Sequence, residues 1–249
     1  MSGHSKWATI KRKKAATDQA RGKVFSKYIK EITIAARHGG GDVETNPRLR
    51  TAIAAAKAVN MPASNIERAV KRGTGEIEGV HIEEAHYEGY GPGGAALLVE
   101  VATDNRNRTA GDVRHLFTKH GGKLGEAGSV AHMFKACGLI VVERSAAAEE
   151  TLMEAALEAG ADDVETGLES YEITSPMARL EAVKDALAAC KIPVASAELT
   201  KLASQHVAVE GKEAEALLRL VDALEEHDDV QKVYSNFDIS EELIARLTR

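Results

Sequence analysis

The chain of 249 residues contains only two cysteines, Cys137 and Cys190, which are far apart and lack the spacing of a metal knuckle or a disulfide framework. We interpret both as small buried hydrophobes in a reducing compartment. The sequence also lacks the run of about 18–20 apolar residues that a membrane helix needs. Its polar, basic start has no apolar segment of a secretory signal. These absences favour a cytoplasmic protein without a membrane partner.

Catalytic and metal-binding motifs are missing as well. The nine histidines form no pair at the spacing that places two zinc ligands on one helix face, and there is no Gly-x-Ser-x-Gly elbow. The glycine-rich segment 89–94 lacks the Lys-Ser/Thr of a phosphate-binding loop, so we interpret it as a tight turn that needs positive φ. The acidic pairs at 225–226 and 228–229 are interpreted as solvated helix ends. We predict no enzyme activity, no metal and no cofactor.

Positive charge is concentrated in the amino-terminal part. Residues 1–72 contain 16 Lys and Arg against 5 Asp and Glu, a net charge of +11, whereas residues 73–249 contain 16 against 33, a net charge of −17. The overall charge of −6 conceals this separation. Because a concentrated cationic surface attracts polyanions, we predict that the amino-terminal part binds nucleic acid. The acidic remainder would orient the protein or contact protein partners.

Three short helices are predicted within residues 18–73. Apolar residues recur every three or four positions between residues 25 and 36, and a run of glycines ends this helix. The second helix has Asn46 as its N-cap, followed by proline at its first position. The third begins at Ser64, where a glutamate three residues later completes a capping box. The apolar stripes are narrow and rich in alanine, so we expect a small helical domain that packs against another part of the chain.

Strand and helix patterns alternate after residue 81. Residues 138–201 have the order strand, helix, two strands, helix and strand, which is the βαββαβ order of a ferredoxin-like unit. The segments on either side of it each lack part of a domain, so we predict that they complete one another. The predicted domains are a basic helical domain at 1–75, a discontinuous α/β middle domain at 81–136 plus 202–249, and an inserted ferredoxin-like domain at 137–201.

The predicted fold class is therefore α+β, with a small N-terminal helical domain followed by two α/β domains. A single continuous domain over residues 81–249 fits the pattern only somewhat less well. Near the start of the predicted insertion we expect two separate strands, one at 129–134 and one at 139–143.

Basic side chains of the amino-terminal part are the candidate nucleic-acid ligands, because Lys and Arg that meet phosphates release condensed counterions. The spacing of Lys23, Lys27 and Lys30 aligns three cations on one side of a helix. Trp7, the only tryptophan, is either a stacking platform for a base or a residue packed on the helical domain. The complete candidate set is Lys6, Trp7, Lys11, Arg12, Lys13, Lys14, Arg21, Lys23, Lys27, Lys30, Arg37, Arg48 and Arg50.

A second group of arginines lies at the start of a predicted helix. Arg106, Arg108 and Arg114 oppose the helix macrodipole there. This arrangement makes sense if helix N–H groups and guanidinium groups bind a phosphate together. The alternative is that Asp104, Asp112 or the acidic domains pair with these arginines. Of the two interpretations we favour phosphate contact.

Motifs distributed over essentially the whole chain resemble the YebC family. They are Gly3-His4-Ser5-Lys6-Trp7, Arg21-Gly22-Lys23, Gly39-Gly40-Gly41-Asp42, Asn46-Pro47-Arg48-Leu49-Arg50, Tyr87-Glu88-Gly89-Tyr90-Gly91-Pro92-Gly93-Gly94, Asp104-Asn105-Arg106-Asn107-Arg108-Thr109, Gly128-Ser129-Val130-Ala131 and Glu154-Ala155-Ala156-Leu157-Glu158-Ala159-Gly160-Ala161. One departure is His132, where relatives are expected to carry an aromatic residue.

The resemblance implies one helical and two α/β domains in a cytoplasmic bacterial protein that acts as a DNA-binding transcriptional regulator. The family has a mitochondrial relative that activates translation of a cytochrome oxidase subunit, and some bacterial members resemble ribosome-associated factors that relieve stalling at proline runs. A translation factor bound to ribosomal RNA is therefore the alternative function. No segment resembles a helix-turn-helix with an evident recognition helix.

Overall fold

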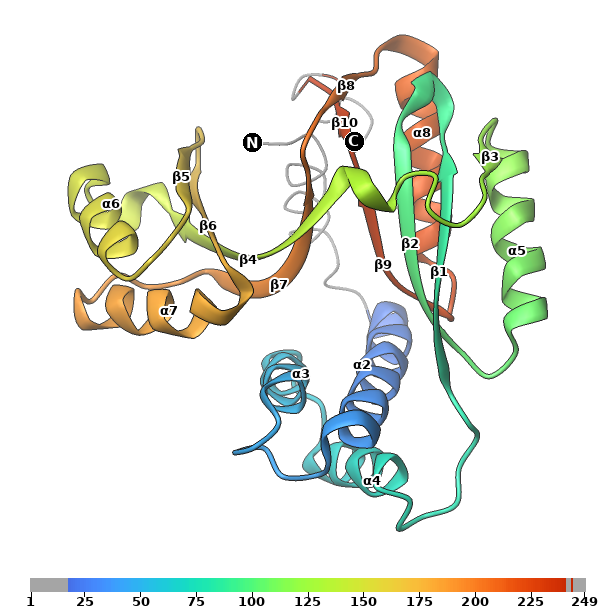
Figure 1. The fold of residues 1–249 in the computed structure, drawn as a ribbon, viewed down its shortest axis with the longest axis horizontal. Helices are drawn as coiled ribbons and strands as arrows, with labels where there is room; N and C mark the ends of the chain where they lie inside the picture. Colours follow the sequence, from blue (N-terminus) through green and yellow to red (C-terminus); the bar gives the residue numbers. More distant parts are fainter. Residues whose placement is uncertain (1–17, 241–242, 244–249) are drawn as a thin grey trace.

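The computed structural model describes residues 18–240 and Leu243; residues 1–17, 241–242 and 244–249 lie outside the description. Figure 1 shows a helical unit below a sheet that carries helices, and a second α/β unit beside them. The arrangement confirms the predicted α+β class. In the described part of the chain, no helix is both long and apolar enough to cross a membrane.

The helical unit consists of α2 (Asp18–Gly39), α3 (Pro47–Ala58) and α4 (Ala63–Gly73). Asn46 caps α3 as predicted, because its side-chain oxygen accepts the N–H of Leu49 at 3.1 Å. The core of this unit is built from narrow apolar stripes, and its buried members are Ile32, Ala35, Ala36, Leu49, Ala52, Ala56, Met61, Ile66 and Ala69. Small side chains let the three helices approach one another closely.

Helix α4 begins differently from the prediction. It starts at Ala63, with Pro62 at the N-cap position and no side-chain cap, so the capping box predicted at Ser64 is wrong. Ser64 lies within the first turn instead. At the other end, a Cβ on Gly73 would lie 2.4 Å from the carbonyl oxygen of Thr33 in α2. The contact between α4 and α2 therefore requires glycine at that position.

The middle unit contains an antiparallel sheet in the order β3-β1-β2-β9. Its strands are β1 (Glu83–Tyr90), β2 (Ala96–Thr103), β3 (Lys123–Leu124) and β9 (Val230–Ser235). Helices α5 (Arg106–Lys119) and α8 (Gly211–Glu225) pack on it around a core that includes Leu97, Phe117 and Leu217. A short parallel pair, β8 (Val207–Ala208) with β10 (Phe237–Asp238), adjoins this unit.

Pairing of β2 with β9 joins segments that are far apart in the sequence, with Leu97 opposite Ser235. This pairing supports the predicted discontinuous middle domain, whose boundaries stay a prediction. The turn between β1 and β2 is a 3-10 helix, η1 (Pro92–Gly94), in which Gly93 and Gly94 have φ of 73° and 75°. The predicted tight turn with positive φ is confirmed.

The other α/β unit has the predicted βαββαβ order. Its elements are β4 (Phe134–Glu143), α6 (Glu149–Glu158), β5 (Asp163–Thr166), β6 (Ser170–Ser175), α7 (Leu180–Ala189) and β7 (Ser196–Ala203), with the 3-10 helices η3 (Arg144–Ala146) and η4 (Met177–Arg179) between them. The sheet order β5-β6-β4-β7 is antiparallel throughout. Its core includes Ile140, Leu152, Ile173 and Leu187. This is the ferredoxin-like arrangement.

The predicted strand at 139–143 is confirmed as part of a longer strand, whereas the separate strand predicted at 129–134 is wrong. A single strand, β4, runs from Phe134 to Glu143, and the 3-10 helix η2 (Ala131–Met133) precedes it. Pairing of β4 with β7 begins at Phe134 and Ala203, so this two-stranded ribbon crosses the predicted boundaries of the insertion. Figure 1 shows the ribbon extending to the middle sheet.

Glu88 explains why the segment before β4 is not a strand. Its carboxylate accepts the backbone N–H groups of Gly128, Val130 and Ala131, each at 2.7 Å. Burial would raise the pKa of Glu88, but these three hydrogen bonds outweigh that effect and lower it. The loop is thus bound to a β1 carboxylate rather than to a neighbouring strand. The exposed His132 lies beside it, with Nδ1 3.4 Å from the oxygen of Gly128.

Ion pairs attach the ribbon to the middle sheet. Lys201 of β7 lies 2.5 Å from Glu100 of β2, and Lys232 of β9 lies 3.3 Å from Glu198 of β7. Although burial opposes ionisation of Glu100, hydrogen bonds from His86, Lys201 and the hydroxyl of Tyr234 lower its pKa to about 2. A charged network therefore positions the ferredoxin-like unit.

Candidate nucleic-acid interface

The three lysines predicted to share one side of α2 do so, and they face the carboxyl end of α8. The ammonium group of Lys23 donates to the carbonyl of Glu226 at 3.2 Å, and that of Lys27 donates to the carbonyl of Glu225 at 2.6 Å. The last carbonyls of a helix have no intrahelical donor and carry the negative end of the macrodipole. These two lysines of the helical unit therefore cap α8 of the middle unit.

Lys30 uses all three of its N–H donors within the chain. It donates to the backbone oxygens of Ala102 at 3.1 Å and Asp228 at 2.9 Å, and to the carboxylate of Asp229 at 2.7 Å. An ammonium group has three donors and no acceptor. In this conformation Lys30 has no donor left for a phosphate, and it binds the helical unit to the middle unit.

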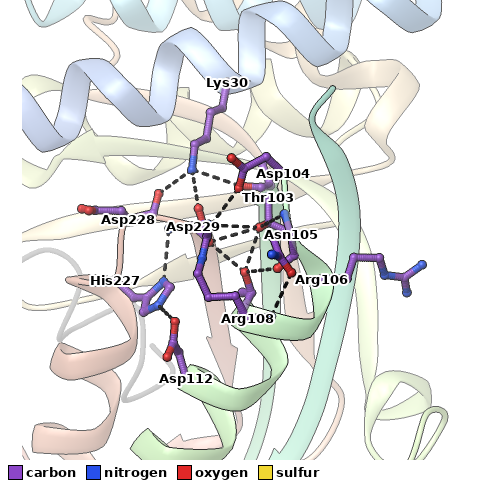
Figure 2. A network of polar contacts seen from close by, with 12 residues as sticks. Lys30, Thr103, Asp104, Asn105, Arg106, Arg108, Asp112, His227, Asp228 and Asp229 are labelled. Carbon is purple, nitrogen blue, oxygen red and sulfur yellow. Dashed lines mark hydrogen bonds and ion pairs between the residues drawn. The ribbon is translucent and has the colours of Figure 1, made fainter. Parts of the chain in front are cut away.

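Asp229 is the centre of this contact (Figure 2). It is only 5% exposed, and besides Lys30 its carboxylate accepts from Thr103 at 3.1 Å, Arg108 at 2.8 Å and Thr109 at 2.7 Å. Burial would raise its pKa, but the hydrogen bonds from Lys30, Arg108 and Thr109 hold the pKa well below its usual range. The interpretation of Asp229 as part of a solvated helix end is wrong.

Arg108 shows that the favoured interpretation of the second arginine group does not hold for this residue. Its guanidinium pairs with Asp104 and Asp229, both at 2.8 Å, as the alternative proposed. The backbone N–H of Arg108 donates to the side-chain oxygen of Asn105, the N-cap residue, at 3.1 Å. The N-cap therefore occupies one N–H group of the first turn of α5, and Arg108 is engaged by carboxylates of the chain itself rather than by a phosphate.

The other two arginines of that group differ from Arg108. Arg106 and Arg114 are exposed on α5, and Figure 2 shows Arg106 directed away from the network around Asp229. That these two arginines contact phosphate stays a prediction.

A groove of about 540 Å³ lies beside Asp229. Its charged lining consists of five acidic residues, three basic residues and a histidine: Asp104, Asp112, Glu226, Asp228, Asp229, Lys23, Lys30, Arg108 and His227. The excess of carboxylates would repel a phosphodiester. The groove therefore separates the two units without offering a phosphate site.

Three more predicted ligands have contacts within the chain. Arg37 donates to the carbonyl of Ile82 at 2.7 Å. Arg48 pairs with Glu31 at 2.9 Å and Glu84 at 2.6 Å, which ties α3 to α2 and β1. Arg50 donates to the two backbone carbonyls of Val43 and Glu44, each at 3.0 Å. These arginines support the loop 40–46 and the contact between units.

The remaining predicted ligands cannot be placed in the same way. Lys6, Trp7, Lys11, Arg12, Lys13 and Lys14 lie outside the described residues. The structure gives the backbone of Arg21 in α2 and no description of its side chain. That these residues bind nucleic acid stays a prediction.

Three exposed cations on α4 were not among the predicted ligands. Arg68, Lys71 and Arg72 lie on the face of the helix opposite the buried Ile66 and Ala69. Their spacing of three and four residues was available in the sequence as a signal, because it places them on one side of a helix.

Fold and charge together define a class: a three-part α+β protein with a cationic helical unit joined to acidic α/β units. Family models match nearly all of it, the TACO1/YebC N-terminal domain over residues 5–76 and the TACO1/YebC second and third domain over residues 82–237. The chain belongs to the TACO1/YebC family. The resemblance to the YebC family is thereby confirmed.

Similar proteins cover the same length. A protein of Desulfatibacillum aliphaticivorans named "probable transcriptional regulatory protein" is 59% identical over 98% of this chain and 99% of its own. A protein of Geobacter sulfurreducens with the same descriptive name is 57% identical over 99% of this chain and 100% of its own. A crystal structure of a conserved hypothetical protein from Aquifex aeolicus superposes with a TM-score of 0.82, at 49% identity, over 91% of this chain and 93% of that one.

Proposed function

We propose that this protein is a cytoplasmic, non-enzymatic transcriptional regulator that binds the backbone of DNA through its cationic amino-terminal part. The observation that carries the proposal is the separation of charge, +11 over residues 1–72 against −17 over the rest. The names of the relatives, which describe transcriptional regulatory proteins, support the regulatory role. Phosphate contacts of this kind give affinity without reading sequence.

The acidic α/β units have a complementary role in this proposal. Because they repel phosphate, DNA would approach the molecule from the helical unit only. The contacts of Lys23, Lys27 and Lys30 with α8 and Asp229 hold that unit in one orientation. The acidic surfaces would then be available to protein partners.

The direct test is a salt series with labelled duplex DNA and the full-length protein, followed by fluorescence anisotropy. We expect the logarithm of the binding constant to fall linearly with the logarithm of salt concentration, with a slope of about −0.9 per phosphate contact. Replacing Lys11, Arg12, Lys13 and Lys14 together by Glu should abolish binding. A wild-type protein that binds no duplex would overturn the proposal.

A matched control separates a local site from a general charge effect. The quadruple change of Arg144, Arg179, Lys184 and Lys191 to Glu alters the net charge equally but lies in the ferredoxin-like unit. It should leave DNA binding nearly unchanged. Equal losses in the two variants would contradict the assignment to the amino-terminal part.

Sedimentation with ribosomes distinguishes the translation alternative. A protein that co-sediments after DNase but not after RNase, and that prefers ribosomal RNA to duplex DNA in the salt series, would be a translation factor rather than a DNA-binding regulator. Under our proposal, RNase treatment changes nothing and duplex DNA is the preferred ligand.

A further inference from the structure

The outward face of α4 is cationic. Ile66 and Ala69 are 7% and 1% exposed and face the helical core, whereas Arg68, Lys71 and Arg72 are exposed on the opposite side. Over residues 47–73 the chain carries six basic residues and a single acidic one, Glu67. Five of the six are exposed, the exception being the half-buried Arg48 that pairs with Glu31 and Glu84, so cations dominate the solvent side of the α3–α4 pair.

These three cations are unlike the lysines of α2. Among the residues that the structure describes, no hydrogen bond or ion pair engages the side chains of Arg68, Lys71 and Arg72. The cationic groups of Lys23, Lys27 and Lys30, by contrast, have acceptors in the middle unit. A phosphate could therefore accept hydrogen bonds from the α4 side chains without breaking any contact that they make within the described chain.

Local helix energetics account for only part of this face. Cations in the last turn of a helix interact favourably with its macrodipole, which covers Lys71 and Arg72. Arg68 lies a turn earlier, where the macrodipole has little effect. The stem of Arg72 also lies against the linker, since a Cβ on Gly79 would be 3.5 Å from its Cδ. The macrodipole therefore accounts neither for Arg68 nor for the excess of positive charge on this face.

We infer that the exposed face of α4, formed by Arg68, Lys71 and Arg72, contacts the phosphodiester backbone of double-stranded DNA. This inference rests on the proposed function and identifies the surface of the protein that would bind the DNA. At 1.5 Å rise per residue, the three side chains originate within about 6 Å along the helix axis. Successive phosphates of one strand advance about 3.4 Å along the duplex axis. The three cations are therefore close enough together to reach two or three neighbouring phosphates of one strand.

The test compares the wild-type protein with a triple variant, Arg68→Gln with Lys71→Gln and Arg72→Gln. Glutamine is a good helix former, so the exposed face keeps its helix while losing three charges. With labelled duplex DNA at about 0.1 M salt, we expect the affinity to fall about 100-fold and the log–log salt slope to become less negative by about 2 to 3. Circular dichroism and thermal unfolding confirm that the variant is folded.

The matched control is the triple variant Lys184→Gln with Lys191→Gln and Lys212→Gln, which removes the same charge from two exposed positions and one half-buried position, Lys184, of the acidic units. Its affinity and salt slope should equal those of the wild type. If the α4 variant also binds like the wild type, the inference is overturned while the proposed function stands. If the wild type binds no duplex, the proposed function itself fails.

An RNA arm separates the two sources of phosphodiester. The same three proteins are titrated with a labelled RNA hairpin of equal charge. Loss of duplex DNA binding in the α4 variant supports the inference. If the α4 variant loses binding to the RNA hairpin but not to duplex DNA, the assignment to DNA is overturned and α4 contacts an RNA partner instead.

Discussion

Helices α2 and α4 each carry three cations on one side, yet the fold treats the two sets in opposite ways. On α2, Lys23, Lys27 and Lys30 donate to carbonyls and a carboxylate of the middle unit. On α4, the corresponding face is open to solvent. The comparison teaches that a cationic helix face predicts an anionic partner without telling whether that partner is another molecule or the same chain.

The physical difference lies in what each helix faces. The end of α8 presents carbonyls without intrahelical donors, and the buried Asp229 requires positive partners. α2 is packed against this end, so its lysines are used there. α4 packs on α2 with its apolar side, and its three cations are exposed on the other side of the helix. The same residue type therefore stabilises the fold on one helix and remains available on the other.

The largest effect is expected from Asp229→Asn. The buried side chain at position 229 would then offer Lys30 and the half-exposed Arg108 an uncharged amide, and removing the buried partner of these ion pairs costs about 3 kcal/mol. Urea unfolding should show this loss. Asp228→Asn is the matched control, because the Asp228 side chain is exposed; it should change stability by less than about 0.5 kcal/mol. Equal losses of stability in the two variants would contradict the assignment of the stabilising role to the buried Asp229.

The next largest effect on stability is expected when a lysine of α2 is replaced, and a lysine of α4 serves as the comparison. Lys30→Met should lower the free energy of unfolding by about 2 kcal/mol, because three acceptors lose a charged donor. Lys71→Met should stay within about 0.5 kcal/mol, since that side chain is exposed. Measured side by side in urea, similar values for the two variants would contradict the assignment of Lys30 to the contact between units.

A pH series should show a change on the order of 1 kcal/mol. The pKa of Asp229 is lower in the folded protein than in the unfolded chain, so the unfolded chain binds more protons between the two values. The stability from this carboxylate is complete above about pH 4 and is lost as the pH falls through the folded pKa. The gap between wild type and Asp229→Asn should therefore narrow from pH 6 to pH 3. A constant gap would show that Asp229 does not act through its charge.

The smallest effect is expected from the lysines at the end of α8. Lys23→Gln with Lys27→Gln should lower the free energy of unfolding by about 1 kcal/mol, because both contacts are with helix-terminal carbonyls near the surface. Arg68→Gln with Lys71→Gln is the matched double variant on α4 and should leave stability unchanged. A larger loss of stability in the α4 variant than in the α2 variant would contradict the assignment of the α2 lysines to the contact between units.

Local patterns predicted much of the fold. The N-cap at Asn46 and the positive-φ turn at Gly93 were predictable because neighbouring residues alone decide them. The segment 129–134 was not, because the carboxylate of Glu88, about forty residues earlier in the chain, binds its N–H groups. Asp229 was missed for the same reason: its partners come from α2, β2 and α5.

By itself, the sequence determined the helices, the βαββαβ order, the separation of charge and the family. These properties follow from composition, periodicity and motifs, which are local in the chain. Only the tertiary structure decided that the lysines of α2 bind the end of α8 and Asp229, whereas Arg68, Lys71 and Arg72 of α4 remain exposed. The reason is that the effect of a charge depends on the dielectric and the hydrogen-bond partners around it, and both are set by chain segments distant in sequence.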